Sequence, residues 1–455
     1  MAEGGDAFLR LPPHLCFSVC RRPQRRGTPS TSKAMNNAKN TTLFPYLERL
    51  LDGEKVEWKT LGEVFHTRNG YTPPKANEEF WTDGTIPWFR MEDIRANGRI
   101  LYDSALHITP QAVKRNGLFK ANSIILATSA TVGEHALLLQ DSLTNQRFTN
   151  FEIKDNLKEQ LLPKFVFYYF FLIDEWCKQH LVIGNFPSVD VQQLINLPFP
   201  IPPLRVQARI VEILDKFTQL EAELEAELEA RKKQYAYYRD QLLNFSQCPP
   251  LNVNIEWKTL GAIGTFYRGT PFQKKDFTSE GVGCIHYGEI YTHYGVSAQD
   301  TISKLSAKKA NNARKANYGD LIIATTSEND EDVCKSVAWL GNESIVVSND
   351  ACYYQHALDP KYVAYFFLTN DFQQQKRAFI IGTKVRRVNP RDLAKIIIPI
   401  PPLSEQRRIV DILDRFDTLT NSISEGLPKE IALRRKQYEY YRDALLNFPR
   451  AEVTA

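Results

Sequence analysis

The sequence lacks the marks of several large classes of protein. Its seven cysteines contain no Cys-x-x-Cys pair, which argues against a disulfide framework and a cysteine-rich zinc site and favours a reducing, cytoplasmic setting. No apolar run approaches the roughly 18–20 residues that a membrane-spanning helix requires, so we expect no membrane association.

A large net charge is absent as well. The 57 Lys and Arg side chains are almost balanced by 53 Asp and Glu, and residues 1–33, with six basic and two acidic side chains, account for the whole difference. A uniformly cationic surface is therefore excluded, and an anionic partner would have to bind local patches.

Residues 1–34 differ in composition from the rest of the chain. They are rich in Arg, Pro, Gly and Ser, and their apolar patch at 15–19 is too broken for a signal peptide. We expect a disordered extension ahead of a natural start at Met35; a basic arm that contacts phosphates is the alternative. The following segment, 44–53, has the pattern of a short amphipathic helix closed by glycine.

From there on the chain is an internal duplication. The segment Val-Glu-Trp-Lys-Thr-Leu-Gly at 56–62 recurs, with Ile for Val, 199 residues later, and so does Pro-Ile-Pro-Pro-Leu at 200–204. A third segment, 233–245, recurs 203 residues later, so the second copy has gained four residues between its last two landmarks. Three ordered matches of this length indicate two copies of one unit.

The two copies resemble each other most at their ends. Their middles, about 63–160 and 262–357, share only a skeleton, which includes β-rich segments at 124–128 and 321–325. A scaffold that stays constant around divergent middles is what two recognition domains with different targets would need.

Each copy ends in the pattern of a long helix. After Pro202-Pro203, which cannot continue a preceding helix, apolar residues from Ile210 to Phe245 mostly recur every three or four positions. Some 40 residues predict a rod of about 60 Å, and two such rods in one chain would most simply pack on each other. Gly426 and Pro428 interrupt the second pattern, so we expect a kink or break there.

The first long helix contains a short repeat. Its Leu-Glu-Ala-Glu units place Leu220, Leu224 and Leu228 four residues apart. Because four residues are slightly more than one helical turn, each unit lengthens the rod by about 6 Å without destroying its seam. These leucines belong either to a spacer-setting helix or to ordinary solvated helix filler.

Recognisable catalytic motifs are missing. The sequence has neither Gly-x-Gly-x-x-Gly nor a Gly-x4-Gly-Lys-[Ser/Thr] phosphate loop. Near misses to the base-binding motif of adenine methyltransferases, at 196–199 and 201–204, each lack an essential member and belong to the repeated proline segment. We therefore predict no catalytic residues, no metal and no cofactor on this chain.

Clusters of basic residues are the remaining candidates for a site. Lys and Arg neutralise phosphates, and Arg can also bind guanine through two hydrogen bonds. The alternative is a solvated surface, balanced by acids such as those at 328–332. The candidates for DNA contact are Arg68, Lys75, Arg90, Arg95, Lys114, Arg115, Arg268, Lys274, Lys275, Lys308, Lys309, Lys384, Arg386 and Arg387.

Taken together, the motifs resemble one family. Two variable domains, each followed by Pro-Ile-Pro-Pro-Leu, a Gln-x2-Ile helix entry and a long helix that ends in Tyr-Tyr-Arg-Asp-x-Leu-Leu, are similar to the specificity (S) subunit of bacterial type I restriction–modification enzymes. The similarity runs from about residue 43 to 448. Residues 1–34 and the interruption at Gly426 and Pro428 depart from it.

The resemblance implies an α+β fold in which two globular mixed α/β target recognition domains alternate with two long helices, paired as an antiparallel coiled coil with pseudo-twofold symmetry. The chain would divide into an extension at 1–34, a helical segment at 35–57, domain 1 at 58–199, the central helix at 200–250, domain 2 at 251–398, the C-terminal helix at 399–448 and a tail at 449–455.

It also implies partners. Each domain would read one half of a bipartite site in double-stranded DNA, while the helices would set the spacer and dock two modification (M) subunits. S-adenosylmethionine and ATP would be bound by the partner subunits, with restriction (R) subunits joining for cleavage.

Two other classes of protein stay open on the sequence alone. A self-sufficient DNA methyltransferase with atypical motifs would transfer methyl groups as a purified chain. A coiled-coil scaffold without sequence-specific DNA binding would leave the divergence of the two middles unexplained.

Overall fold

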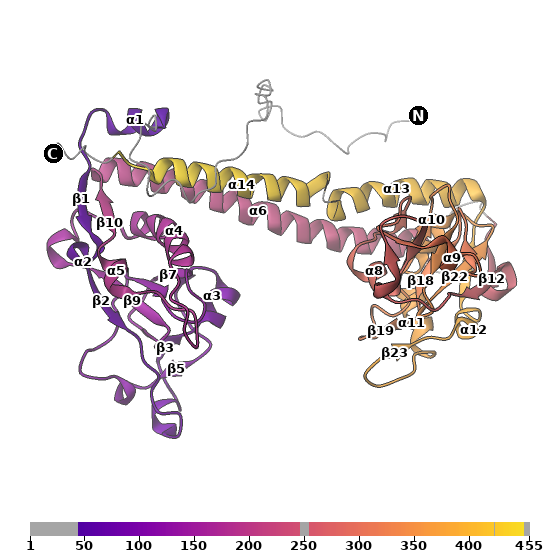
Figure 1. Cartoon of the computed structure of the whole chain (residues 1–455), viewed down its shortest axis with the longest axis horizontal. Coiled ribbons are helices and arrows are strands. Elements are labelled where there is room, and N and C mark those ends of the chain that lie inside the picture. Colours follow the sequence, from indigo (N-terminus) through magenta and orange to yellow (C-terminus); the bar gives the residue numbers. More distant parts are fainter. Residues whose placement is uncertain (1–43, 246–253, 423, 450–455) are drawn as a thin grey trace, which may run out of the picture.

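The protein consists of two globular bodies at opposite ends of a long helical rod (Figure 1). The computed structural model describes residues 44–245, 254–422 and 424–449. The expectations for residues 1–34 lie outside the described residues. Across the described ranges, no helix combines the length and apolar character needed to cross a membrane.

The first body is built on a five-stranded sheet. Its order is β2-β9-β6-β7-β4, antiparallel except where β4 joins β7. A smaller sheet has the order β5-β3-β8. The strands are β2 Phe65–Asn69, β3 Ile86–Phe89, β4 Ile100–Leu101, β5 His107–Ile108, β6 Ile124–Ala127, β7 His135–Leu138, β8 Leu143–Thr144 and β9 Phe148–Ile153.

The second body repeats the main sheet strand for strand. Its order β12-β22-β18-β20-β15 has the same directions, and the central strands β6 and β18 are the two β-rich segments matched in the sequence. A second sheet, β13-β16-β14-β21-β17, is larger than its counterpart. The strands are β12 Gly264–Arg268, β13 Phe277–Thr278, β14 Val282–Ile285, β15 Ser297–Ala298, β16 Ser303–Leu305, β17 Lys315–Ala316, β18 Leu321–Ala324, β20 Ser336–Trp339, β21 Ile345–Val347 and β22 Ala351–His356.

The repeated sequence motifs meet at the neck of each body. Strand β1 (Glu57–Thr60) pairs with β10 (Pro198–Ile201), and β11 (Glu256–Thr259) pairs with β24 (Ile397–Ile400) in the same register. The chain therefore enters and leaves each body through one two-stranded ribbon. This pairing explains why the two ends of each copy, far apart in sequence, were preserved together.

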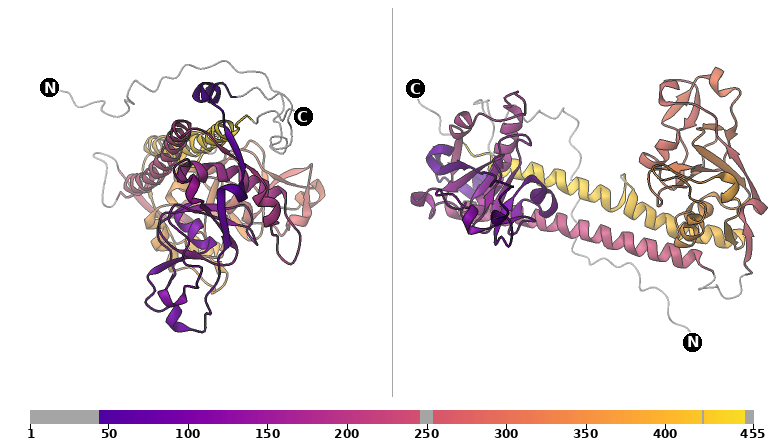
Figure 2. Two further views of the ribbon diagram at one scale, coloured as in Figure 1. Left: turned by 90° about the vertical axis from the view of Figure 1, so that its left-hand side faces the viewer. Right: turned by 90° about the horizontal axis from the view of Figure 1, so that it is seen from below.

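The rod consists of two antiparallel helical segments, which we call the two strands of the rod although both are α-helical (Figure 2). One strand is the 40-residue helix α6 (Leu204–Leu243), and the other consists of α13 (Leu403–Asn421) and α14 (Gly426–Leu446). The predicted long helix and the predicted break at Gly426 are both confirmed. Leu220, Leu224 and Leu228 are only half-buried, because the middle of the rod is a seam between two helices.

Aromatic clamps join the two strands near each end of the rod. At one end the Phe217 ring stacks on Tyr441, with 5.5 Å between centroids, and lies 6.3 Å from Tyr438. At the other end Phe416 lies 5.7 Å from Tyr238 and 6.3 Å from Tyr235. The equivalent residues come from opposite strands, so the clamps display the pseudo-twofold symmetry directly.

A buried glutamine holds each body to its rod. The Gln207 amide nitrogen donates to the carbonyls of Gln160 and Pro202, both at 2.7 Å, while its oxygen accepts from the Leu162 N–H at 2.9 Å. In the second copy, Gln406 accepts from the Asp359 N–H and donates to the Pro401 carbonyl. The Gln-x2-Ile motif is thus a structural joint.

A carboxylate adds a second joint in each copy. Asp215 accepts from Lys164 and from the Tyr168 hydroxyl, each at 2.6 Å. Asp414 does the same with Lys361 and Tyr365, at 2.7 and 2.6 Å. Burial, followed by the bond to Asp414, raises the pKa of Tyr365 well above its ordinary value, so this hydroxyl remains a donor.

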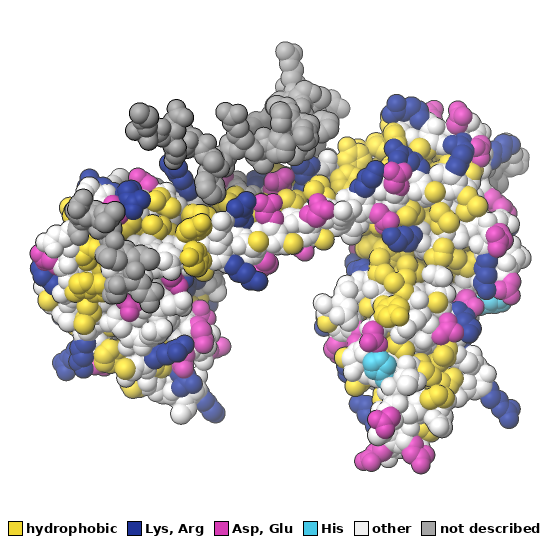
Figure 3. Space-filling view, turned by 180° about the vertical axis from the view of Figure 1, so that it is seen from behind, with side chains coloured by type: hydrophobic (Ala, Val, Ile, Leu, Met, Phe, Trp, Pro, Cys, Tyr) yellow, Lys and Arg dark blue, Asp and Glu magenta, His cyan; other side chains and the backbone are white. Residues whose placement is uncertain are grey.

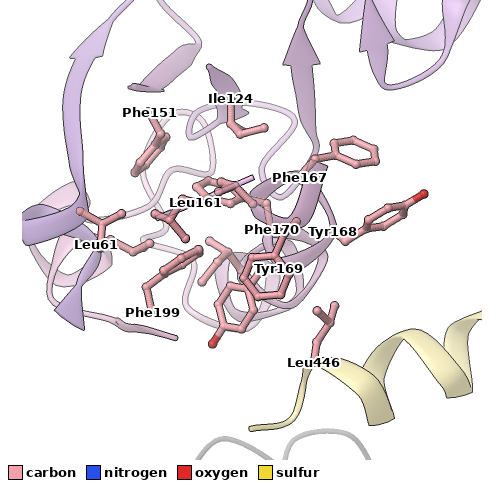
Figure 4. Close-up of a cluster of buried hydrophobic side chains, with 14 of the residues drawn as sticks. Leu61, Ile124, Phe151, Leu161, Phe167, Tyr168, Tyr169, Phe170, Phe199 and Leu446 are labelled. Atoms are coloured by element: carbon pink, nitrogen blue, oxygen red, sulfur yellow. The ribbon is translucent and has the colours of Figure 1, made fainter. Parts of the chain in front are cut away.

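The core of the first body extends onto the rod. Helix α4 (Pro163–Gln179) covers the sheet and contributes Phe165, Phe170 and neighbouring aromatics, while Leu446 from α14 completes the cluster (Figure 4). Helix α1 (Pro45–Leu51) lies within the segment 44–53 that the sequence predicts to be a short helix. The other short helices are α2 Leu61–Val64, α3 Met91–Asn97, α5 Val191–Ile195, α7 Leu260–Ile263, α8 Tyr287–Thr292, α9 Ala307–Ala310, α10 Pro360–Phe366, α11 Asn370–Arg377 and α12 Pro390–Leu393.

Candidate nucleic-acid interface

The two bodies project from the same side of the rod and leave an open span between them (Figures 1 and 3). An extended ligand could lie across the tips of both bodies at once, provided that their outer loops offer suitable side chains. Ten of the fourteen candidate basic residues fall into three groups, one on the first body and two on the second.

In the first body, the Arg68 side chain is hydrogen-bonded to the protein's own backbone. Its guanidinium donates to the carbonyls of Asn116, Gly117 and Leu118 and lies 4.6 Å from the Phe119 ring centroid. Burial lowers the pKa of Arg68. These bonds hold the loop that follows Lys114 in place.

Arg68 and Tyr71 together present Lys114 and Arg115. The Tyr71 hydroxyl donates to the Ala112 carbonyl at 3.0 Å and accepts from the Lys114 N–H at 2.9 Å. The Lys114 ammonium lies 4.3 Å from the Tyr71 ring centroid, and both basic side chains are exposed. This loop is an organised cationic projection.

The other candidates of the first body are more dispersed. Lys75 is exposed on the loop after Tyr71, and Arg95 is exposed on α3. Arg90 is half-buried at the start of α3, where its side chain lies 3.8 Å from Glu92. The structure therefore brings Arg68, Lys114 and Arg115 together, whereas Lys75, Arg90 and Arg95 lie apart from that group.

Several aromatic residues of the first body lie close in sequence to its basic candidates. Trp88 and Phe89 are buried core residues of β3. The Trp88 and Trp81 indoles donate to the carbonyls of Tyr71 and Pro74, at 3.0 and 3.3 Å. These two bonds hold the 71–74 loop in place, and the buried Trp88 and Phe89 rings are not presented for stacking on bases.

In the second body, four lysines lie on adjacent segments. Strand β13 pairs with β16, which brings Lys274 and Lys275, on a 3-10 turn before β13, toward Lys308 and Lys309 on α9. Lys309 forms a 2.6 Å ion pair with Asp276, whose pKa it lowers. The other three ammonium groups remain exposed.

The 381–387 loop forms the third basic group. Strand β23 (Arg386–Arg387) pairs with β19 (Thr326–Ser327) and fixes the base of the loop, while Lys384 and Arg387 are exposed. Arg386 is different, because its guanidinium lies 2.8 Å from Asp330 and also donates to the Gly382 carbonyl. Arg268 is exposed at the end of β12.

Among the described residues, the acidic loop at 328–332 forms no ion pair with the lysines Lys308 and Lys309 of the second basic group. Its Asp330 carboxylate instead pairs with Arg386. The buried Lys376 ammonium donates to the carbonyls of Glu331 and Val333 at 3.0 and 2.8 Å. Burial lowers the pKa of Lys376. This residue holds two loops together from inside the body.

Sequence reasoning missed the first body's counterpart of the 381–387 loop. Residues 181–188 are closed by the same kind of bridge, Val182 with Ser188, yet they carry no charged side chain. Ile183 is 94% exposed and Phe186 66% exposed. The Ile-Gly pair shared by both loops was the signal that could have identified them as equivalents.

A buried ion cluster was missed as well. The Asp174 carboxylate lies 2.7 Å from both His135 Nδ1 and Arg99, among the rings of Phe167, Phe170 and Phe171. Burial would raise the pKa of Asp174, but His135 and Arg99 together hold it below its ordinary value. Nowhere in the described ranges do three or more His, Cys, Asp or Glu come together in a way that could hold a metal ion.

Comparisons with known proteins agree with this architecture. The family described as the type I restriction modification DNA specificity domain matches residues 53–230 and 252–433, so each match spans one body and most of one rod strand. The EcoprrI specificity subunit of Escherichia coli is 38% identical over 393 residues, covering 84% of this chain and 92% of the relative.

Two further comparisons extend over nearly the whole chain. The EcoR124I/EcoR124II specificity subunit of E. coli is 32% identical over 430 residues, covering 90% of this chain and 98% of the relative. A chain from a structural study of complex assembly and conformational transition in the type I R-M system has a TM-score of 0.62 at 16% identity, covering 86% of this chain and 98% of that one, and it supports the fold.

Fold and comparisons together define a two-headed recognition scaffold of the kind that confers specificity on a multisubunit enzyme. The chain belongs to the family of type I restriction–modification specificity subunits.

Proposed function

We propose that this chain is the non-catalytic DNA-recognition subunit of a type I restriction–modification enzyme, and that each body reads one half of a bipartite site in double-stranded DNA. The observation that carries the proposal is one scaffold with two different outer surfaces. The main sheets have the same strand order, yet the equivalent loops 181–188 and 381–387 are uncharged in one body and basic in the other.

The basic groups supply the affinity for DNA in this proposal. Lys114 and Arg115 on one body and Lys274, Lys275, Lys308, Lys384 and Arg387 on the other are exposed and can neutralise phosphates. Arg68 and Arg386 position these loops. Base selectivity comes from the loops that differ between the bodies, because phosphate contacts by themselves carry no sequence information.

The rod sets the unread gap between the two half-sites. The clamps at Phe217 and Phe416, together with the joints at Gln207 and Gln406, tie both bodies to helices of fixed length. A change in the number of Leu-Glu-Ala-Glu units around Leu220, Leu224 and Leu228 would then alter the separation of the bodies.

The rod also presents two equivalent surfaces for partner subunits. Tyr237 and Tyr440 occupy the same position in the repeated Tyr-Tyr-Arg-Asp segment and are 61% and 63% exposed. Retention of an exposed aromatic in both copies, while the recognition loops diverged, favours two copies of one partner, the modification subunit. In this assembly S-adenosylmethionine and ATP are bound by partner subunits, and restriction subunits join for cleavage.

Replacement of both exposed tyrosines tests the docking surface. Tyr237→Ala with Tyr440→Ala is expected to reduce co-purification of modification subunits while leaving DNA binding by the specificity chain intact, since neither ring packs across the rod. Phe217→Ala is the matched control, because it weakens the rod itself and lowers the unfolding temperature. Undiminished assembly of the tyrosine variant would remove these residues from the interface.

Mapping of methylated adenines in host DNA, with and without this gene, tests the proposed function. The proposal predicts one bipartite motif that disappears with the gene and returns with it. Methyl transfer by the purified chain alone would instead establish a self-sufficient methyltransferase, and DNA binding indifferent to sequence would favour the scaffold.

A further inference from the structure

The two strands of the rod contain different numbers of residues between the same two clamps. From Phe217 to Tyr235, α6 advances 18 residues, whereas the opposite strand advances 22 residues from Phe416 to Tyr438. Because Phe217 lies beside Tyr438 and Tyr235 lies beside Phe416, both segments span the same distance. The second strand therefore carries a surplus of four residues.

The surplus is taken up where α13 gives way to α14. The first of these helices ends at Asn421 and the second begins at Gly426, and the described residues between them, Ser422, Ser424 and Glu425, lie outside regular helix. The Ser422 N–H still donates to the Thr418 carbonyl at 3.3 Å, and the Glu425 N–H donates to the Ser422 hydroxyl at 3.1 Å.

Gly426 shows that the chain folds back by about one helical turn. A Cβ placed on Gly426 would lie 2.4 Å from the Thr418 carbonyl oxygen and 2.7 Å from that of Leu419. In an uninterrupted helix, residues 418 and 426 would be about 12 Å apart along the axis. Gly426 therefore restarts the helix beside the last turn of α13, with a left-handed φ of +74° that disfavours other residues.

The surplus equals one Leu-Glu-Ala-Glu unit of the opposite strand. We propose that the break between α13 and α14 is a length reserve: it stores one four-residue unit, so the rod can lengthen when α6 gains a unit without leaving the second strand too short. Pro428 is tolerated in the first turn of α14, whereas it would disfavour a continuous helix, so the reserve stays folded back at the present length. Only the consequence of this reserve for the DNA gap depends on the proposed function.

Three variants of the full chain test the reserve. The first inserts Leu-Glu-Ala-Glu after Glu227, the second deletes 425–428, and the third combines both changes. The deletion removes Gly426 and Pro428 together and leaves Ile431 at the position that Leu228 occupies in the other strand, so α6 itself is the template for the shortened strand.

The readout is the distance between spin labels on the two bodies, attached at Glu159→Cys and Asp300→Cys after Cys16, Cys20 and Cys248 are replaced by Ser. The insertion should lengthen the mean distance by about 6 Å, and the deletion should leave it unchanged. The combined variant should fail to lengthen, because its second strand holds no reserve. Shortening by the deletion, or full lengthening of the combined variant, would overturn the proposal.

A second measurement does not depend on the deletion variant folding. Gly426→Ala should lower the unfolding temperature of the native-length chain but not that of the inserted chain, where residue 426 becomes part of a continuing helix. Gly98→Ala is the matched control, since Gly98 has a φ of +79° with open space around its Cβ position and should respond equally in both backgrounds. Equal losses from Gly426→Ala in both backgrounds would reject the reserve.

The distance measurement uses no DNA. A lengthened distance with an unchanged DNA gap would therefore refute the spacer function while the length reserve stands.

Discussion

At the scale of single residues, the sequence identified charges but not their neighbours. Lys384 and Arg386 looked alike in the basic stretch, yet only Lys384 is exposed, because Arg386 is paired with Asp330. Lys376, a basic residue of the preceding helix α11, is buried against backbone carbonyls. Availability for a ligand depends on contacts across 40 or more residues of chain, which a local pattern does not contain.

Charge reversal at Lys384 and Arg387 tests the exposed loop. The double variant Lys384→Glu with Arg387→Glu should weaken DNA binding by about tenfold or more and reduce the slope of log affinity against log salt by about 2, as two phosphate contacts are lost. Lys216→Glu on the rod is the control, because it makes the same kind of charge change away from the loops. An unaltered affinity and slope would exclude the loop from the interface.

The buried carboxylate predicts a pH dependence of stability. Because the pKa of Asp174 is held below its ordinary value in the folded chain, its ion cluster stabilises fully above about pH 4 and loses that contribution as the pH falls through the lowered value. Asp174→Asn should thus reduce the free energy of unfolding at pH 7, with the difference from wild type shrinking toward pH 3. A difference that is constant from pH 7 to 3 would contradict this role.

At the scale of elements, the sequence predicted the long helices and their break, but not the short strands. Apolar periodicity and the paired prolines defined α6 within a few residues, because helix contacts are local. Strands such as β4 and β15 have two residues each and exist only through parallel pairing with β7 and β20. Such pairing is set by the folded body and leaves no periodic signal.

The neck joint gives a prediction at this scale. Gln207→Leu should destabilise the first body by roughly 2–4 kcal/mol, since the Leu162 N–H and the carbonyls of Gln160 and Pro202 lose their partner in a buried site. Denaturant unfolding of this variant beside Gln193→Leu, an exposed position on α5, measures the effect. Equal stability of the two variants would show that the joint is dispensable.

At the scale of the whole molecule, duplication explains what could be foreseen. Two copies of one unit, each with its own long helix, predicted two bodies and a paired rod, and the family resemblance supplied the antiparallel arrangement that the structure shows. The sequence could not place the loops at the tips, because the middles share few residues. The roles of the candidate basic residues in DNA contact stay predictions.

The central claim is that the rod holds two different readers at a fixed separation. Its most direct test inserts one Leu-Glu-Ala-Glu unit after Glu227 and maps methylated adenines across the host genome. The account predicts the same two half-sites with a gap longer by about one or two base pairs. An unchanged gap, or altered half-sites at the old spacing, would contradict it.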